Sequence, residues 1–163
     1  MQLAGNLFQL IRVYLALHWL GAVHVPLHAA LSVEQAITQI QHAQAMLAIV
    51  DPRAPAAAAL GAAAIDTPVI THDDWLRPCD NDRSTELPEP APVAGDQLAT
   101  ILYTSGTTGQ PLGVMLTHDN LASNALAVCQ AVRPPDDEVR LSILPLSHIY
   151  GRTCDLYCWL ARG

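Results

Sequence analysis

Three stretches in the first half of the chain have the apolar spacing or the composition of helices. Apolar residues over 7–20 recur every three or four positions, which predicts a helix that ends before a glycine. A second helix is predicted from Ser32 to about residue 42, because Ser32 and Gln35 have the spacing of a capping box. A weaker helix is expected over the alanine-rich stretch 56–64, where one glycine costs roughly 1 kcal/mol relative to alanine.

Short, continuous apolar runs separate these helices. The runs over 22–27, 45–50 and 67–71 are too short for helices and do not alternate with polar residues, so each is predicted to be a buried strand. Apolar strands that alternate with helices along the chain are typical of a parallel sheet covered on both faces. The pattern therefore predicts an α/β fold with a partial parallel sheet and helices on both of its faces.

A segment without periodicity divides the chain. Residues 77–96 are rich in proline and acidic residues, which indicates a surface loop. Beyond this loop the pattern predicts three further strands and two further helices. The strands are expected over 97–103, 114–117 and 139–144, and the helices over 119–132, with Asp119 as N-cap, and over 147–162.

The stretch between the first two of these strands is dense in hydroxyl groups and glycines. Its residues are Thr104, Ser105, Gly106, Thr107, Thr108 and Gly109. Glycines permit positive φ and close backbone approach, so successive amides can point at one oxyanion beside the hydroxyl donors. This chemistry favours a phosphate-binding loop, and the alternative is an ordinary hairpin turn. A Walker loop does not fit, because Gly109 is followed by Gln-Pro-Leu and not by Lys-Ser/Thr.

Composition and charge narrow the function classes. Hydrophobic residues make up 51% and charged residues 14%, which supports a buried core. The net charge of −7 argues against a nucleic-acid partner, since phosphate backbones are bound by basic patches. All 8 basic residues are arginines, so a mechanism that needs lysine must take it from outside this chain.

The 4 cysteines show no spacing typical of a disulfide framework. Cys154 and Cys158 lie one helical turn apart near His148, and a metal site is one interpretation of them. We favour two buried thiols on one helix face and predict no metal ligand. The apolar N-terminal run has some features of a signal peptide, but histidines and Pro26 interrupt it. We therefore expect a cytoplasmic protein, with peripheral attachment to a membrane as the alternative.

Two long motifs resemble the signatures of one enzyme family. The string YTSGTTGQPLGVMLTHDN, residues 103–120, closely resembles the phosphate loop of the adenylate-forming superfamily, which includes acyl-CoA synthetases, luciferases and peptide-synthetase adenylation domains. LSILPLSHIYGRT, residues 141–153, resembles its second signature, and residues 14–35 resemble the segment before the loop. The resemblance covers nearly the whole chain and is greatest to the long-chain fatty acid–CoA ligase branch.

The resemblance implies a reaction and a site. Members of this family activate a carboxylate with ATP to an acyl-adenylate and then transfer the acyl group to coenzyme A. By resemblance, Thr104–Gly109 would hold the β and γ phosphates of ATP with Mg²⁺ nearby, His148 would lie near the acyl carboxylate and the α-phosphate, and the substrate would be a fatty acid. The chain would then be a partial AMP-binding domain, with an α/β half over 1–76, the loop over 77–96 and a phosphate-loop half over 97–163.

Two departures from the family pattern affect the expected activity. Leu112 stands where the family has lysine, and losing that charge-assisted contact to a phosphate costs ~1.5–3 kcal/mol. Family members are also several times longer, so we expect an internal slice without the small C-terminal domain and its adenylation lysine.

Such a slice would be inactive alone, would tend to self-associate, and would need a complementing C-terminal portion encoded nearby. Two alternatives stay open for its function. One is a non-catalytic remnant with weak or no nucleotide binding. The other is a relative that passes the acyl group to a carrier protein or stops at the adenylate.

Overall fold

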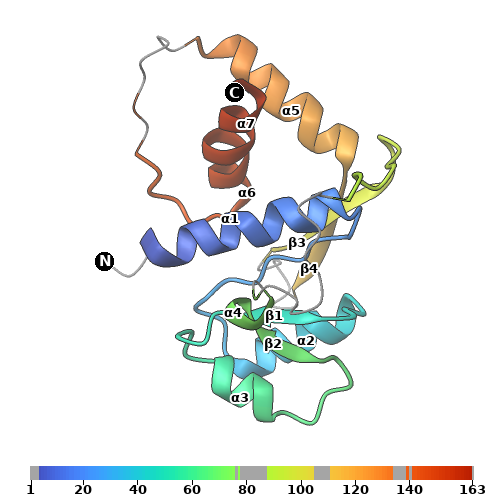
Figure 1. Cartoon of the computed structure of the whole chain (residues 1–163), viewed down its shortest axis with the longest axis vertical. Helices are drawn as coiled ribbons and strands as arrows, with labels where there is room; N and C mark the ends of the chain where they lie inside the picture. The colour runs from blue at the N-terminus through green and yellow to red at the C-terminus, as the bar shows by residue number, and fades with distance from the viewer. Residues whose placement is uncertain are drawn as a thin grey trace.

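The computed structural model describes residues 4–75, 77, 88–104, 111–133, 139 and 141–162. It confirms the α/β class, with a small parallel sheet and surrounding helices (Figure 1). In chain order the elements are α1 (Ala4–Trp19), α2 (Val33–His42), β1 (Ala48–Val50), α3 (Ala57–Ala62), β2 (Val69–Thr71), α4 (His72–Trp75), β3 (Leu98–Thr104), β4 (Leu112–Thr117), α5 (His118–Ala131), α6 (Ile149–Gly151), the π-helical segment η1 (Arg152–Tyr157) and α7 (Cys158–Arg162).

The first half folds around the parallel pair β1 and β2. Their register runs from Ala48 opposite Val69 to Val50 opposite Thr71. A hydrophobic core of Ala36, Ile40, Ala48 and Leu60 lies between this pair and the helices α2 and α3. The capping box of α2 is present as predicted, because Gln35 N–H donates to Ser32 Oγ at 3.2 Å and Ser32 N–H donates to Gln35 Oε1 at 3.0 Å.

The second sheet is the antiparallel pair of β3 and β4. The strand predicted over 22–27 is reduced to one parallel bridge between His24 and Thr100. His24 N–H donates to Ala99 O at 3.0 Å, and Ile101 N–H donates to His24 O at 3.0 Å. Pro26 explains why the pairing stops there, since proline has no N–H to donate to the next rung of a ladder.

The helix after the second sheet begins earlier than the sequence predicted. Thr117, not Asp119, is the N-cap of α5, and its hydroxyl accepts the N–H of Asn120 at 3.2 Å. Asn120 Oδ1 accepts the N–H of Thr117 in return, at 3.0 Å. Asp119 therefore lies inside the first turn, where its negative charge still interacts favourably with the helix dipole.

The strand predicted over 139–144 is wrong. Residues 141–143 belong to no strand, and the side chains of Val139, Leu141 and Ile143 are 95%, 82% and 73% exposed. In Figure 1 this stretch lies apart from both sheets. A strand needs a neighbour for its N–H and C=O groups, and the described part of the chain places none beside it.

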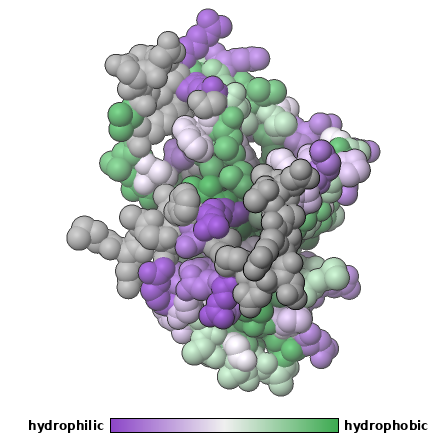
Figure 2. All heavy atoms as spheres, viewed as in Figure 1, coloured by the Kyte–Doolittle hydropathy of each residue, from purple (hydrophilic) through white to green (hydrophobic). Residues whose placement is uncertain are grey.

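The predicted C-terminal helix is present as α6, η1 and α7 in succession. A second hydrophobic core of Tyr14, Leu146 and Leu156 joins α1, the turn before α6 and η1. Figure 2 shows further apolar residues on the visible surface, above and below a central group of hydrophilic ones. Among the described helices, none is both long and apolar enough to cross a membrane.

Candidate functional site

A cavity of about 490 Å³ lies where α2, the end of β3 and the turn before α6 meet. Its volume is in the range of small-molecule sites. The polar lining includes Thr104 from the first signature and Ser147 and His148 from the second. Glu34 and Gln35 of α2 also line it. The fold therefore brings the two signatures to one cavity, although they lie far apart in sequence.

Thr104 is the one residue of the predicted phosphate loop whose position the structure describes. It ends β3, is exposed, and pairs with Leu112 at the start of β4. Ser105, Gly106, Thr107, Thr108 and Gly109 lie outside the described residues. The strands on both sides of the loop therefore fix where it leaves and re-enters the sheet.

His148 is held by the turn that precedes α6. Its backbone N–H donates to Pro145 O at 2.8 Å, and it is the N-cap of α6. The side-chain Nδ1 accepts the N–H of Tyr150 at 3.2 Å. A backbone N–H can only donate, so Nδ1 is the acceptor and the ring hydrogen is assigned to Nε2. The ring thus presents a donor at the wall of the cavity.

Tyr103 joins the strand side of the cavity to α2. Its hydroxyl lies 2.7 Å from His42 Nδ1 and donates to Gln39 O at 3.3 Å. Burial raises the pKa of Tyr103 above its ordinary value, so the hydroxyl stays protonated at neutral pH. The sequence placed Tyr103 at the end of a strand and the start of the first signature, but its contact with α2 depends on tertiary packing.

The second signature contains a buried arginine near its end. Arg152 is 0% exposed, its Nε–H donates to Leu146 O at 3.0 Å, and its Nη1 lies 3.3 Å from His24 Nδ1. Burial and then the Arg152 charge hold the pKa of His24 well below its ordinary value of 6.5. Burial likewise raises the pKa of Tyr14, whose ring lies 5.2 Å from the guanidinium, to about 12.

Sequence reasoning missed this group of residues. Its only sequence signal is an arginine among apolar residues at the end of the second signature.

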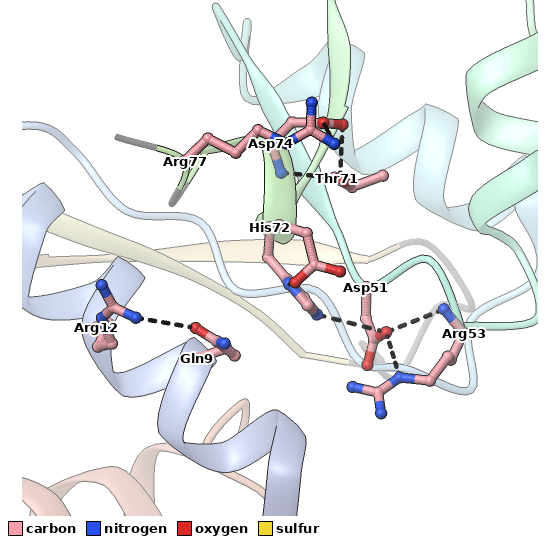
Figure 3. A network of polar contacts seen from close by, with 9 residues as sticks. Gln9, Arg12, Asp51, Arg53, Thr71, His72, Asp74 and Arg77 are labelled. Atoms are coloured by element: carbon pink, nitrogen blue, oxygen red, sulfur yellow. Dashed lines mark hydrogen bonds and ion pairs between the residues drawn. The ribbon is translucent and has the colours of Figure 1, made fainter. Parts of the chain in front are cut away.

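The described cysteines Cys129, Cys154 and Cys158 do not line this cavity, and neither do the residues of a polar network around Asp51. Cys158 is buried, and its Sγ donates to Ala125 O of α5 at 3.6 Å. In Figure 3, His72 approaches Asp51, with Nε2 3.5 Å from Oδ1, and Arg53 donates to the same carboxylate oxygen through its backbone N–H. Burial raises the pKa of Asp51, but the hydrogen bonds from Arg53 outweigh it and the net shift is downward. Within the described residues no group of three or more His, Cys, Asp or Glu side chains could hold a metal ion.

Comparisons with known proteins bear on the family. This chain is 44% identical over 72 residues to long-chain-fatty-acid–CoA ligase ACSBG2 of Xenopus laevis, a match that covers 42% of this chain and 10% of the relative. It is 42% identical over 80 residues to long-chain-fatty-acid–CoA ligase 1 of Homo sapiens, covering 45% of this chain and 12% of the relative.

Among solved structures, ATP-bound MatB from Rhodopseudomonas palustris superposes with a TM-score of 0.77 and 32% identity, covering 95% of this chain and 32% of MatB. The chain thus matches about a tenth of these curated relatives and about a third of the solved structure. The resemblance to adenylate-forming enzymes seen in the two signatures is confirmed. The family described as "AMP-binding enzyme" matches residues 2–163, and this chain therefore belongs to that family.

Proposed function

We propose that this chain forms the ATP-phosphate and acyl-carboxylate side of the active site of a long-chain fatty acid–CoA ligase. One observation carries the proposal: Thr104, at the entrance of the glycine-rich loop, lines the same cavity as His148 of the second signature. The names of the curated relatives support a fatty acid as the acyl substrate. ATP in the similar MatB structure supports the nucleotide.

The proposed chemistry is the formation of an acyl-adenylate. A carboxylate oxygen of the fatty acid attacks the α-phosphorus of ATP, a new O–P bond forms, and the bond from that phosphorus to the pyrophosphate oxygen breaks. Negative charge concentrates on the phosphoryl oxygens, and donors fixed in advance stabilise it. The His148 Nε2–H and the Thr104 hydroxyl are the donors that we assign to this role. The thiol sulfur of coenzyme A would then bond to the acyl carbon, the bond from that carbon to the phosphate oxygen would break, and AMP and the thiol proton would leave.

Mg²⁺ fits this cavity only as a partner of the triphosphate. Magnesium usually binds one or two carboxylates together with phosphate oxygens and waters, and a complete protein cage is not needed. Glu34 and Thr104 are oxygen donors on the lining. Bound there with ATP, the ion would neutralise negative charge on the phosphates. The hydroxyl oxygen of Thr104 would help to hold the ion in place.

A second candidate function is a non-catalytic remnant, and Leu112 favours it. This side chain is 58% exposed directly after the loop, where it offers no charge to a phosphate. The chain also contains no lysine, while the family uses one for adenylation. For the first candidate, the same absence of lysine leads us to propose that this polypeptide needs a complementing portion for turnover. This holds whether the acceptor is coenzyme A or a carrier protein.

Calorimetry separates the two candidates. Mg²⁺-dependent binding of ATP and pyrophosphate is measured for the natural chain and for the variants Thr107→Ala, Gly109→Ala and His148→Ala. Ser123→Ala, at an exposed hydroxyl on α5, is the matched control. We expect weak binding that the first three variants reduce and the control does not. If well-folded protein does not bind ATP at millimolar concentration, the chain is a non-catalytic remnant.

A further inference from the structure

We propose that Arg152 is a positioning residue for His148. In this proposal it joins the turn that carries His148 to the strand that leads into the phosphate loop. The inference rests on the function proposed above for His148, because only then does the position of that ring affect nucleotide binding. Two sets of contacts and the cost of burying the Arg152 guanidinium carry it.

The first set ties Arg152 to the turn. Its Nε–H donates to Leu146 O at 3.0 Å, two residues before His148, and its backbone N–H donates to His148 O at 3.1 Å. The same side chain is 0% exposed, so water does not compete for these bonds. The carbonyl groups on both sides of Ser147 are therefore fixed by a single residue.

The second set ties Arg152 to β3. Nη1 lies 3.3 Å from His24 Nδ1. The backbone of His24 is in turn paired with β3, because it accepts the hydroxyl of Thr100 at 2.6 Å and the N–H of Ile101 at 3.0 Å. Movement of the turn relative to β3 would break one of these bonds. Arg152 therefore sets the separation between the two walls of the cavity.

The third observation concerns the cost of burying this guanidinium. Removing a cation from water is expensive unless an anion pairs with it, and among the described residues no carboxylate lies within ion-pair distance of Arg152. The Tyr14 ring, 5.2 Å away, offsets part of the cost. An apolar side chain would fill the same space with less penalty. The planar fork of donors, which a lysine lacks, accounts for arginine at this position.

A first test uses the natural protein. Hydrogen exchange of arginine Nε–H groups is followed by NMR, with exposed Arg12 and Arg77 as internal references. Since Arg152 Nε–H is buried and bonded to Leu146 O, we expect it to exchange at least tenfold more slowly than the references. Exchange at the rate of Arg12 would overturn the proposal.

The second test uses two matched pairs of variants. Arg152→Lys keeps the charge but loses the fork, and Arg77→Lys makes the same change at an exposed position. His24→Asn keeps an acceptor near the place of Nδ1, while His24→Leu, of similar size, removes it. For each variant the His148 ring signal and Mg·ATP affinity are measured. We expect Arg152→Lys and His24→Leu to shift the ring signal and to weaken binding roughly tenfold, and the other two to do neither.

A merely structural role makes a different prediction. If Arg152 acts through His148, Arg152→Lys should weaken ATP binding less than about twofold when His148→Ala is already present. Equal weakening in both backgrounds, or equal effects of His24→Asn and His24→Leu, would overturn the proposal. If Arg152→Lys does not fold, the comparison of His24→Asn with His24→Leu still tests the proposal. If no form binds ATP, the proposed function fails, while the ring signal and the exchange rates still test the positioning role.

Discussion

The carboxylate of Asp119 occupies the space in which a Cβ on residue 95 would lie, so the start of α5 rests directly on Gly95. The N–H of Asp119 donates to Gly95 O at 2.8 Å, and the N–H of His118 donates to Gln97 O at 3.1 Å. These contacts join the segment before β3 to the helix after β4. They therefore close the base of the hairpin whose other end carries the phosphate loop.

Replacing Gly95 with alanine should lower the free energy of unfolding by only about 0.5–1 kcal/mol, because the new methyl group forces the exposed Asp119 carboxylate to move to another position. Urea denaturation measures the change. In an Asp119→Ala background the same replacement should cost less than half as much. An unchanged cost there would show that the backbone at residue 95, and not this contact, opposes the substitution.

The cap of α5 gives a second stability prediction. Thr117→Ala should cost ~1 kcal/mol, because it removes the acceptor of the Asn120 N–H. Thr117→Ser keeps that acceptor and should restore most of the loss. Asp119→Asn, which changes only the interaction with the helix dipole, should cost less than Thr117→Ala. A larger effect at Asp119 would favour the cap that the sequence suggested.

Local patterns predicted the elements whose contacts are local. The capping box of Ser32 and Gln35 needs only residues three apart, and α2 forms as expected. The same logic failed at α5, where Thr117 pairs with asparagine and not with the usual Glu or Gln, so the sequence pattern did not reveal this cap and the prediction of Asp119 was wrong. The strand over 139–144 failed because pairing depends on a neighbour that apolar spacing cannot reveal.

The candidate site shows the same difference between residues found from local motifs and residues that depend on tertiary packing. Thr104 and His148 were found from motifs that run along the chain, and the structure places both on one cavity. Arg152 was missed because its importance comes from burial and from His24, which lies far away in sequence. Charge patterns along a sequence show where an arginine is, but only packing decides whether it is solvated.

The buried histidine makes stability depend on pH. His24 has a pKa well below 6.5 in the folded chain, whereas the unfolded chain titrates near 6.5. Below pH 6.5 the unfolded state therefore binds more protons, so this contribution to stability is full above pH 6.5 and is lost as the pH falls. The pKa of His18 is lowered as well, chiefly by burial, so His18 also makes the folded state less stable as the pH falls.

Urea denaturation between pH 7.5 and 5.5 measures this dependence. We expect the slope to approach ~1.4 kcal/mol per pH unit for His24 and to be smaller in His24→Asn, which cannot take up the proton. Equal slopes in the two proteins would show that His24 is accessible to protons in the folded state.

Restoring the missing cation tests the placement of the loop. Leu112 is 58% exposed and lies opposite Thr104, so a lysine at this position should reach bound phosphates. Leu112→Lys should tighten binding of the Mg²⁺ complex of ATP by roughly tenfold or more and leave adenosine binding unchanged. Val114→Lys, on the same face of β4 but farther from the loop, is the control. Equal gains for both ligands, or for both variants, would contradict the placement.

Three exposed apolar side chains before the turn that carries His148 lead to a prediction about association. Val139, Leu141 and Ile143 alternate along the chain and are 95%, 82% and 73% exposed, so an extended segment here would present one apolar side to solvent. Exposed apolar segments of this kind promote association between chains. We expect the natural chain to self-associate at micromolar concentrations, as sedimentation velocity would measure. The double variant Leu141→Lys with Ile143→Lys should shift the distribution toward monomer, because burying two added charges between chains is unfavourable. Met46→Lys changes an equally exposed apolar side chain, 91% accessible, in the other half of the molecule. If that control increases the monomer fraction to the same degree, then net charge, and not these three side chains, governs self-association.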